Sequence, residues 1–136
     1  MKNSKKRNFF VIALFVGCAL FLFPSTDASA QAWNAPAKYK TMKNPKAGKG
    51  DVGGVGKALW AQHCKSCHGK EGYGDGKKAA ELDTEMRDFT SKAVQGQTDG
   101  ELYYKAIIGK DEMPNFEKKI PEGDRWLLVN FMRTLK

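Results

Sequence analysis

The sequence predicts a small all-α domain preceded by a segment that is not part of its fold. The chain has 136 residues, which is enough for one modest domain. Between residues 51 and 136, apolar residues recur at steps of three and four, the spacing of amphipathic helices. The sequence shows no alternation typical of strands and no internal repeat. We therefore expect helices packed around one core.

Residues 1–30 have the composition of a secretory signal peptide. Basic residues begin the chain, an apolar run extends from Phe9 to Phe23, and Ala28-Ser29-Ala30 has the small-x-small pattern of a cleavage site. We expect cleavage before Gln31 and a periplasmic or otherwise extracytoplasmic protein. One alternative is an uncleaved anchor, although the run is shorter than the roughly 20 residues of a spanning helix. The other is lipidation of Cys18, although the apolar run continues beyond it.

Residues 31–50 are predicted to form a basic linker or arm, followed by the folded domain at residues 51–136. The arm contains Pro and Gly, no helical periodicity, five lysines and no acidic residue. From Asp51 onward, basic and acidic residues are equal in number, although the whole chain has a formal net charge of +8. The domain itself is therefore not a cationic docking surface. We expect the arm to be a solvated leader, with a docking element as the alternative.

The domain is expected to contain helices at both of its ends. The first should begin after Asp51, a residue type that caps helix starts, and run toward Cys64. Pro121 and the acidic residues after it indicate the start of the last helix, which should reach Leu135. A glycine-rich loop follows the first helix. Two further helices are expected, around Lys77–Leu82 and near Asp99–Ile108.

Cys64-Lys65-Ser66-Cys67-His68 has the C-x-x-C-H spacing by which haem is attached covalently. Residues i and i+3 of a helical turn face the same way, so both thiols can form thioethers along one edge of a porphyrin. His68 follows directly and can give the iron its proximal imidazole ligand. We expect one covalently attached haem c, which would also supply apolar interior to a domain with a thin core.

Three other interpretations of the two cysteines remain open. A thioredoxin-like redox pair would need a βαβ pattern, which the sequence lacks. A zinc site would need a further pair of Cys or His ligands. Disulfides are common in exported chains, but the spacing of Cys64 and Cys67 and the following His68 argue against one here.

The second axial ligand of the iron distinguishes a carrier from a catalyst. The chain has two histidines, and His63, next to Cys64, cannot easily reach the opposite face of the same haem. Met113 lies in a loop, where Pro114 disfavours helical geometry and suits a side chain presented inward. We predict Met113 as the ligand, the alternative being a methionine that fills a core gap. The other methionines of the mature chain lie in less suitable places: Met42, Met86 and Met132.

Residues 51–136 resemble the class I c-type cytochromes, in particular the single-domain bacterial monohaem kind. The resemblance rests on Gly56, Leu59-Trp60, the C-x-x-C-H motif with Gly69, Gly72-Tyr73-Gly74-Asp75-Gly76, Arg87-Asp88-Phe89, Leu102-Tyr103-Tyr104, Met113-Pro114-Asn115-Phe116 and Arg125–Phe131. It implies the small cytochrome c fold with haem in the core and crossing N- and C-terminal helices, Gly56 and Trp60 facing Phe131. It also implies Cys64 and Cys67 thioethers and ligation by His68 and Met113.

The sequence departs from the resemblance at one position. Relatives commonly carry a proline before the Arg-Asp-Phe stretch, which helps to place a carbonyl on the ring N–H of the proximal histidine. Here that position is Met86.

We expect an electron carrier and not an enzyme. An iron ligated on both faces by His68 and Met113 has no free position for a substrate. The protein would shuttle single electrons in an extracytoplasmic respiratory chain and dock transiently on donor and acceptor redox complexes. We expect no nucleic-acid partner, and membrane contact only through partners, an uncleaved signal or a lipidated Cys18. The alternatives are a haem-containing subunit of a larger oxidoreductase, and a haem enzyme or gas sensor with an open sixth position.

Overall fold

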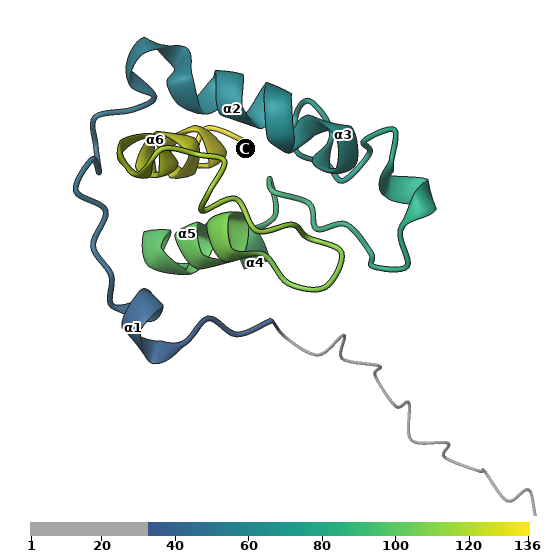
Figure 1. Ribbon diagram of the computed structural model, residues 1–136, viewed down its shortest axis with the longest axis horizontal. Helices are drawn as coiled ribbons and strands as arrows, with labels where there is room; N and C mark the ends of the chain where they lie inside the picture. The colour runs from purple at the N-terminus through teal and green to yellow at the C-terminus, as the bar shows by residue number, and fades with distance from the viewer. Residues whose placement is uncertain (1–32) are drawn as a thin grey trace, which may run out of the picture. The chain divides into compact units, whose positions relative to one another are not determined.

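Two crossing helices frame residues 33–136, the part of the chain that this computed structural model describes (Figure 1). They are α2, Val55–His63, and α6, Glu122–Met132, and α5, Asp99–Ile108, packs against α6. Short helices and 3-10 turns join them: α1 (Ala37–Lys40), η1 (Val52–Gly54), α3 (Lys65–His68), η2 (Ala79–Glu81) and α4 (Lys92–Gln95). The described residues contain no strand, which confirms the predicted all-α class. None of their helices combines the length and apolarity needed to cross a membrane.

The crossing of α2 and α6 takes place at Gly56. A Cβ there would overlap the carbonyl oxygen of Leu127 and lie 2.8 Å from the Cβ of Phe131. Only glycine therefore allows the two helices to approach this closely. One turn later, the ring of Trp60 packs on that of Phe131, with centroids 5.8 Å apart. The contact between the N- and C-terminal helices that the resemblance implies is confirmed.

Local hydrogen bonds set where the long helices begin. Asp51 caps α2 across the η1 turn, since its carboxylate accepts the backbone N–H groups of Gly56 at 2.6 Å and Lys57 at 2.9 Å. The helix consequently begins at Val55, later than the sequence suggested. A capping box between Thr98 and Glu101 starts α5, which has the predicted bounds. The last helix begins after Pro121 as expected but ends before Leu135.

The core lies around α5 and α6 and extends to Trp60 and Cys64 at α2. Its largest fully buried side chains are Ile107, Ile120, Leu128, Val129 and Met132. Burying a side chain of this size contributes roughly 1.5–3 kcal/mol. The rings of Tyr103 on α5 and Trp126 on α6 also pack together, with centroids 4.5 Å apart. Met132, with 1% of its surface exposed, is therefore a packing residue, as the sequence suggested.

The arm is packed on the domain from residue 33 onward, whereas we expected a solvated leader. The ring of Tyr39 lies 4.6 Å from that of Tyr104 and 6.4 Å from that of Tyr103, measured between centroids. Trp33 meets Tyr104 edge-on at 6.3 Å. Aromatic contacts of this kind bury large apolar surfaces. They hold the arm on the domain although its sequence has no helical periodicity.

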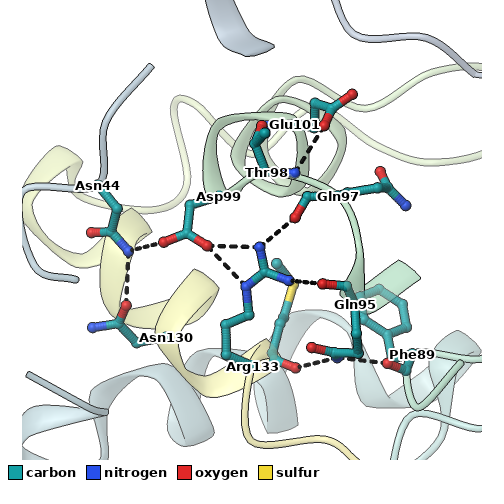
Figure 2. A network of polar contacts seen from close by, with 10 residues as sticks. Asn44, Phe89, Gln95, Gln97, Thr98, Asp99, Glu101, Asn130 and Arg133 are labelled. Carbon is teal, nitrogen blue, oxygen red and sulfur yellow. Dashed lines mark hydrogen bonds and ion pairs between the residues drawn. The ribbon is translucent and has the colours of Figure 1, made fainter. Parts of the chain in front are cut away.

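A polar network fastens the same arm to α5 and α6 (Figure 2). The side-chain amide of Asn44 donates to Asp99 at 2.8 Å and to Asn130 at 2.9 Å. Asn130 in turn donates to the backbone carbonyls of Lys46 at 2.9 Å and Gly50 at 2.7 Å. These bonds join residues far apart in the sequence, so no local sequence pattern predicts them.

Candidate functional site

The cysteines and the histidine of the motif lie on one continuous turn at the end of α2 and in α3. The Cys64 N–H still donates to the Trp60 carbonyl at 2.9 Å, and the His68 N–H donates to the Cys64 carbonyl at 2.9 Å. Helical geometry thus continues through the motif, and side chains three residues apart face the same way. Cys64 and Cys67 are both free thiols. The structure therefore brings together the three residues proposed for covalent haem attachment.

The thiol of Cys64 is held in its neutral form. Only 5% of the residue is exposed, and burial, together with the neighbouring Cys67, raises its pKa to about 12. Thiol–disulfide exchange and zinc binding both use the thiolate, so this environment suits neither. Among residues 33–136, moreover, no three His, Cys, Asp or Glu side chains converge as a metal site. The geometry therefore disfavours the zinc and thioredoxin-like alternatives.

His68 is surrounded by aromatic rings. Its imidazole lies 5.1 Å from Phe89 in an edge-on contact and 5.8 Å from Trp60, measured between ring centroids. The Trp60 indole N–H donates to the Gly69 carbonyl at 3.0 Å, which fixes the ring beside His68. Burial lowers the pKa of His68, so the imidazole keeps the free lone pair with which a neutral histidine ligates metal. Sequence analysis had assigned Trp60 to helix packing alone.

One ring nitrogen of His68 lacks a partner. Within the described residues, Nδ1 is the buried side-chain polar atom that makes no hydrogen bond. Such atoms are rare in folded proteins and are found at functional sites. Met86, where relatives commonly carry proline, packs its backbone toward Gly74, whose added Cβ would lie 3.1 Å from the Met86 carbonyl oxygen. Within the described residues, the Met86 carbonyl therefore does not serve as an acceptor for His68 Nδ1.

The glycine-rich loop folds back on the motif turn. The N–H groups of Gly74 and Gly76 donate to the carbonyls of His68 and Cys67, at 3.0 Å and 3.1 Å. A Cβ at Gly76 would lie 2.5 Å from the Cys67 backbone, so a side chain there would push the loop away. The loop thereby satisfies the carbonyls at the end of α3 and holds the backbone of the turn in place.

Met113 reaches the core from a separate loop. It exchanges two backbone hydrogen bonds with Lys110, at 3.0 Å and 2.9 Å, and the Phe116 N–H closes the loop onto the Ile107 carbonyl at 2.7 Å. The residue is half-buried, and its side chain packs against the hydrophobic cluster that contains Cys64. The predicted haem site therefore combines the two cysteines and His68 of one turn with the Met113 thioether of a separate loop.

The match to a family model decides what this site belongs to. Residues 53–132 match the family described as cytochrome C oxidase, cbb3-type, subunit III. The chain belongs to this cytochrome c family. It is a class I c-type cytochrome, as the resemblance implied. A search of curated proteins gave no match for this cytochrome.

Solved structures of c-type cytochromes share the fold. The chain is similar to the c-type cytochrome KustC0563, at a TM-score of 0.52 and 29% identity, over 60% of this chain and 96% of that one. A point mutant of that protein gives a TM-score of 0.52 and 28% identity, over 60% and 99%. A chain of the Kuenenia stuttgartiensis reducing HAO-like protein complex Kustc0457/Kustc0458 gives 0.54 and 29%, over 60% of this chain and 42% of that longer one.

The residues present fit the covalently bound haem c that membership in the family implies. Two free thiols stand one helical turn apart, and a half-buried neutral imidazole follows them directly. Soft thioether and imidazole groups are the ligands that protein-bound haem iron accepts. Cys64, Cys67 and His68 would hold the group, and Met113 offers a thioether from the adjoining core.

Proposed function

We propose that the protein is a monohaem electron carrier, exported by the signal peptide at residues 1–30 to the periplasm or an equivalent compartment. Bound haem c supplies an iron that accepts one electron and later releases it. The observation that carries the proposal is the α3 turn, on which two unpaired thiols precede a half-buried, neutral His68. The signal peptide lies outside the described residues.

Each ligand residue has a separate role in this proposal. Cys64 and Cys67 would form the thioethers that keep the group in place, and His68 would give its imidazole to the iron. Met113 would give its thioether to the iron, which would favour the ferrous state relative to a second imidazole. Because the hydrogen bonds of the Met113 loop and of the motif turn would hold both ligands in either oxidation state, little would rearrange when one electron enters or leaves. No position is then free for a substrate.

The partners are proposed to be a donor and an acceptor redox complex of a respiratory chain. A carrier must release each partner quickly, which favours an interface below roughly 1,200 Å². The arm lysines at positions 38, 40, 43 and 49 are exposed, and the arm is docked on α5, so positive charge is fixed to one part of the surface. Charge of this kind raises the rate of association more than the affinity.

Intact mass and absorption spectra test the proposal. The secreted protein should weigh as much as residues 31–136 plus one haem, and its ferric form should show the weak long-wavelength band of Met–iron charge transfer. Met113→Ala should keep the added mass, lose the band and bind carbon monoxide in the ferrous form. Absence of added mass would overturn the assignment of haem. A native protein without the band that binds carbon monoxide readily would indicate an enzyme or gas sensor.

A second candidate is a haem-containing subunit of a larger oxidoreductase. It is favoured by the similarity to a chain of the reducing HAO-like complex. The match covers less than half of that longer chain. Size-exclusion chromatography of the natively expressed protein separates the two candidates. A carrier elutes alone at the size of its own chain. A subunit elutes with its complex and stays bound to it in moderate salt.

A further inference from the structure

Glu112, the residue before Met113, joins two segments that are distant in the sequence. One carboxylate oxygen accepts the backbone N–H of Thr84 at 2.8 Å, and the other accepts that of Asp83 at 3.2 Å. Figure 1 shows the loop that follows α5 reaching toward the segment that precedes α4. Among the hydrogen bonds of residues 33–136, these two are the ones that connect residues 109–116 with residues 77–88.

The segment that Glu112 binds leads directly to the His68 side of the site. Two residues after Thr84, the backbone of Met86 packs against Gly74, and the Gly74 N–H donates to the His68 carbonyl at 3.0 Å. The Phe89 N–H likewise donates to the Gly72 carbonyl at 2.7 Å. A short series of contacts therefore runs from the residue beside Met113 to the His68 turn.

The Met113 loop has few other constraints at its tip. Its own hydrogen bonds, between Lys110 and Met113 and between Phe116 and Ile107, close the loop on itself. Asp111 is exposed and adopts a positive φ of 54°. The bridging group is a glutamate side chain, which is a carboxylate at neutral pH. A charged acceptor makes the stronger kind of hydrogen bond.

We propose that Glu112 is a positioning residue for Met113. Its bonds to Asp83 and Thr84 keep the Met113 loop docked, and they limit how often the thioether leaves the iron. The inference rests on the axial role proposed above for Met113. Because both bonds are to an exposed charged group, their combined effect on the fraction of time that Met113 is detached is about tenfold.

Competition by free imidazole measures this effect on the haem-loaded protein. Imidazole binds the ferric iron only when Met113 has left it, so its apparent affinity reports the detached fraction. Glu112→Ala should bind imidazole about tenfold more tightly than the native protein. Glu112→Gln should fall between the two, because its amide oxygen still accepts one bond. Glu117→Ala is the matched control, since the side chain of that exposed acid accepts a hydrogen bond only from Asn115, and it should behave as the native protein.

Hydrogen exchange provides a readout that does not depend on the iron. The backbone amides of Asp83 and Thr84 should exchange faster in Glu112→Ala than in the native protein, and at an unchanged rate in the control. If the native protein shows the Met–iron band but its affinity for imidazole is within about twofold of that of Glu112→Ala, only the positioning role is overturned. Absence of the band from the native protein would instead overturn the ligation by Met113, and the role of Glu112 with it.

Discussion

The side-chain amide of Asn44 lies 2.9 Å from the side-chain oxygen of Asn130, so the arm is bonded to the last turn of α6. Asn130 is 7% exposed, and a polar group this deeply buried requires partners. The hydrogen-bond partners of its side chain belong to the arm: Asn44, Lys46 and Gly50. The arm therefore completes the polar interior of the cytochrome domain and does not simply precede it.

Replacing Asn44 should destabilise the domain from a distance. Asn44→Ala leaves the Asn130 side-chain oxygen buried without a donor, and such a group costs about 1–3 kcal/mol. Denaturant unfolding of the haem-loaded protein measures the loss. Thr41→Ala is the control, because that exposed hydroxyl bonds only to carbonyls of α1, and it should change the free energy of unfolding by less than about 0.5 kcal/mol. Equal stabilities for the two variants would contradict the role given to Asn44.

Removing the arm should lower the stability of the domain further, and a substitution at Asn130 should restore part of the loss. A chain that begins at Asp51 loses all three Asn130 partners and the contacts of Tyr39 with α5. Its melting temperature should fall by about 10 °C or more. Asn130→Leu should destabilise the full chain but stabilise the shortened one, because it removes the unsatisfied amide. The same sign of effect in both chains would show that the arm does not serve Asn130.

The sequence predicted the helical turn of the C-x-x-C-H motif better than it predicted the docking of the arm. Spacing alone indicated the Cys64-to-His68 turn, and α5 could be placed because its pattern is local. The contacts of Asn44 and Glu112 were not foreseen, because each joins residues far apart in the chain and neither residue type signals its partner. Asp51 was identified as a cap, but its carboxylate reaches across a 3-10 turn, so the start of α2 was misplaced.

The helix crossing should not tolerate a methyl group at Gly56. Gly56→Ala would place a Cβ onto the Leu127 carbonyl, and forced separation of packed elements costs typically about 1–3 kcal/mol. Gly123→Ala is the matched control on α6, because a Cβ there meets nothing within 4 Å. It should be neutral or stabilising by up to about 1 kcal/mol, since alanine favours helix. Comparable loss of stability in both variants would mean that the crossing is looser than described.

The contribution of Glu101 should depend on pH. The hydrogen bond from the Thr98 backbone N–H lowers the pKa of Glu101 below its ordinary 4.5. Its contribution to stability is therefore fully present above pH 4.5 and is lost as the pH falls through the lower folded value. Glu101→Gln keeps the acceptor but not the charge, so it should be about 0.3–1 kcal/mol less stable than the native protein at pH 7.

Urea unfolding at pH 7 and at pH 3 tests this dependence. The difference between the native protein and Glu101→Gln should shrink at the lower pH. Glu81→Gln, at an exposed position in η2, should stay within about 0.5 kcal/mol of the native protein at both values. A difference for Glu101→Gln that grows on acidification would have the wrong sign for a carboxylate that is charged when folded.

The two histidines provide a final comparison, because they are close in sequence but differ in surroundings. His63 packs near the Phe116 ring, with centroids 5.4 Å apart, whereas His68 lies against Trp60 and Phe89. His63→Ala should therefore keep both the covalently added haem mass and the Met–iron band. His68→Ala should lose the band even in molecules that carry the added mass, because the thioethers do not supply the missing imidazole. A normal band in His68→Ala, or its loss in His63→Ala, would reassign the proximal ligand and place the haem on a different face of the α3 turn.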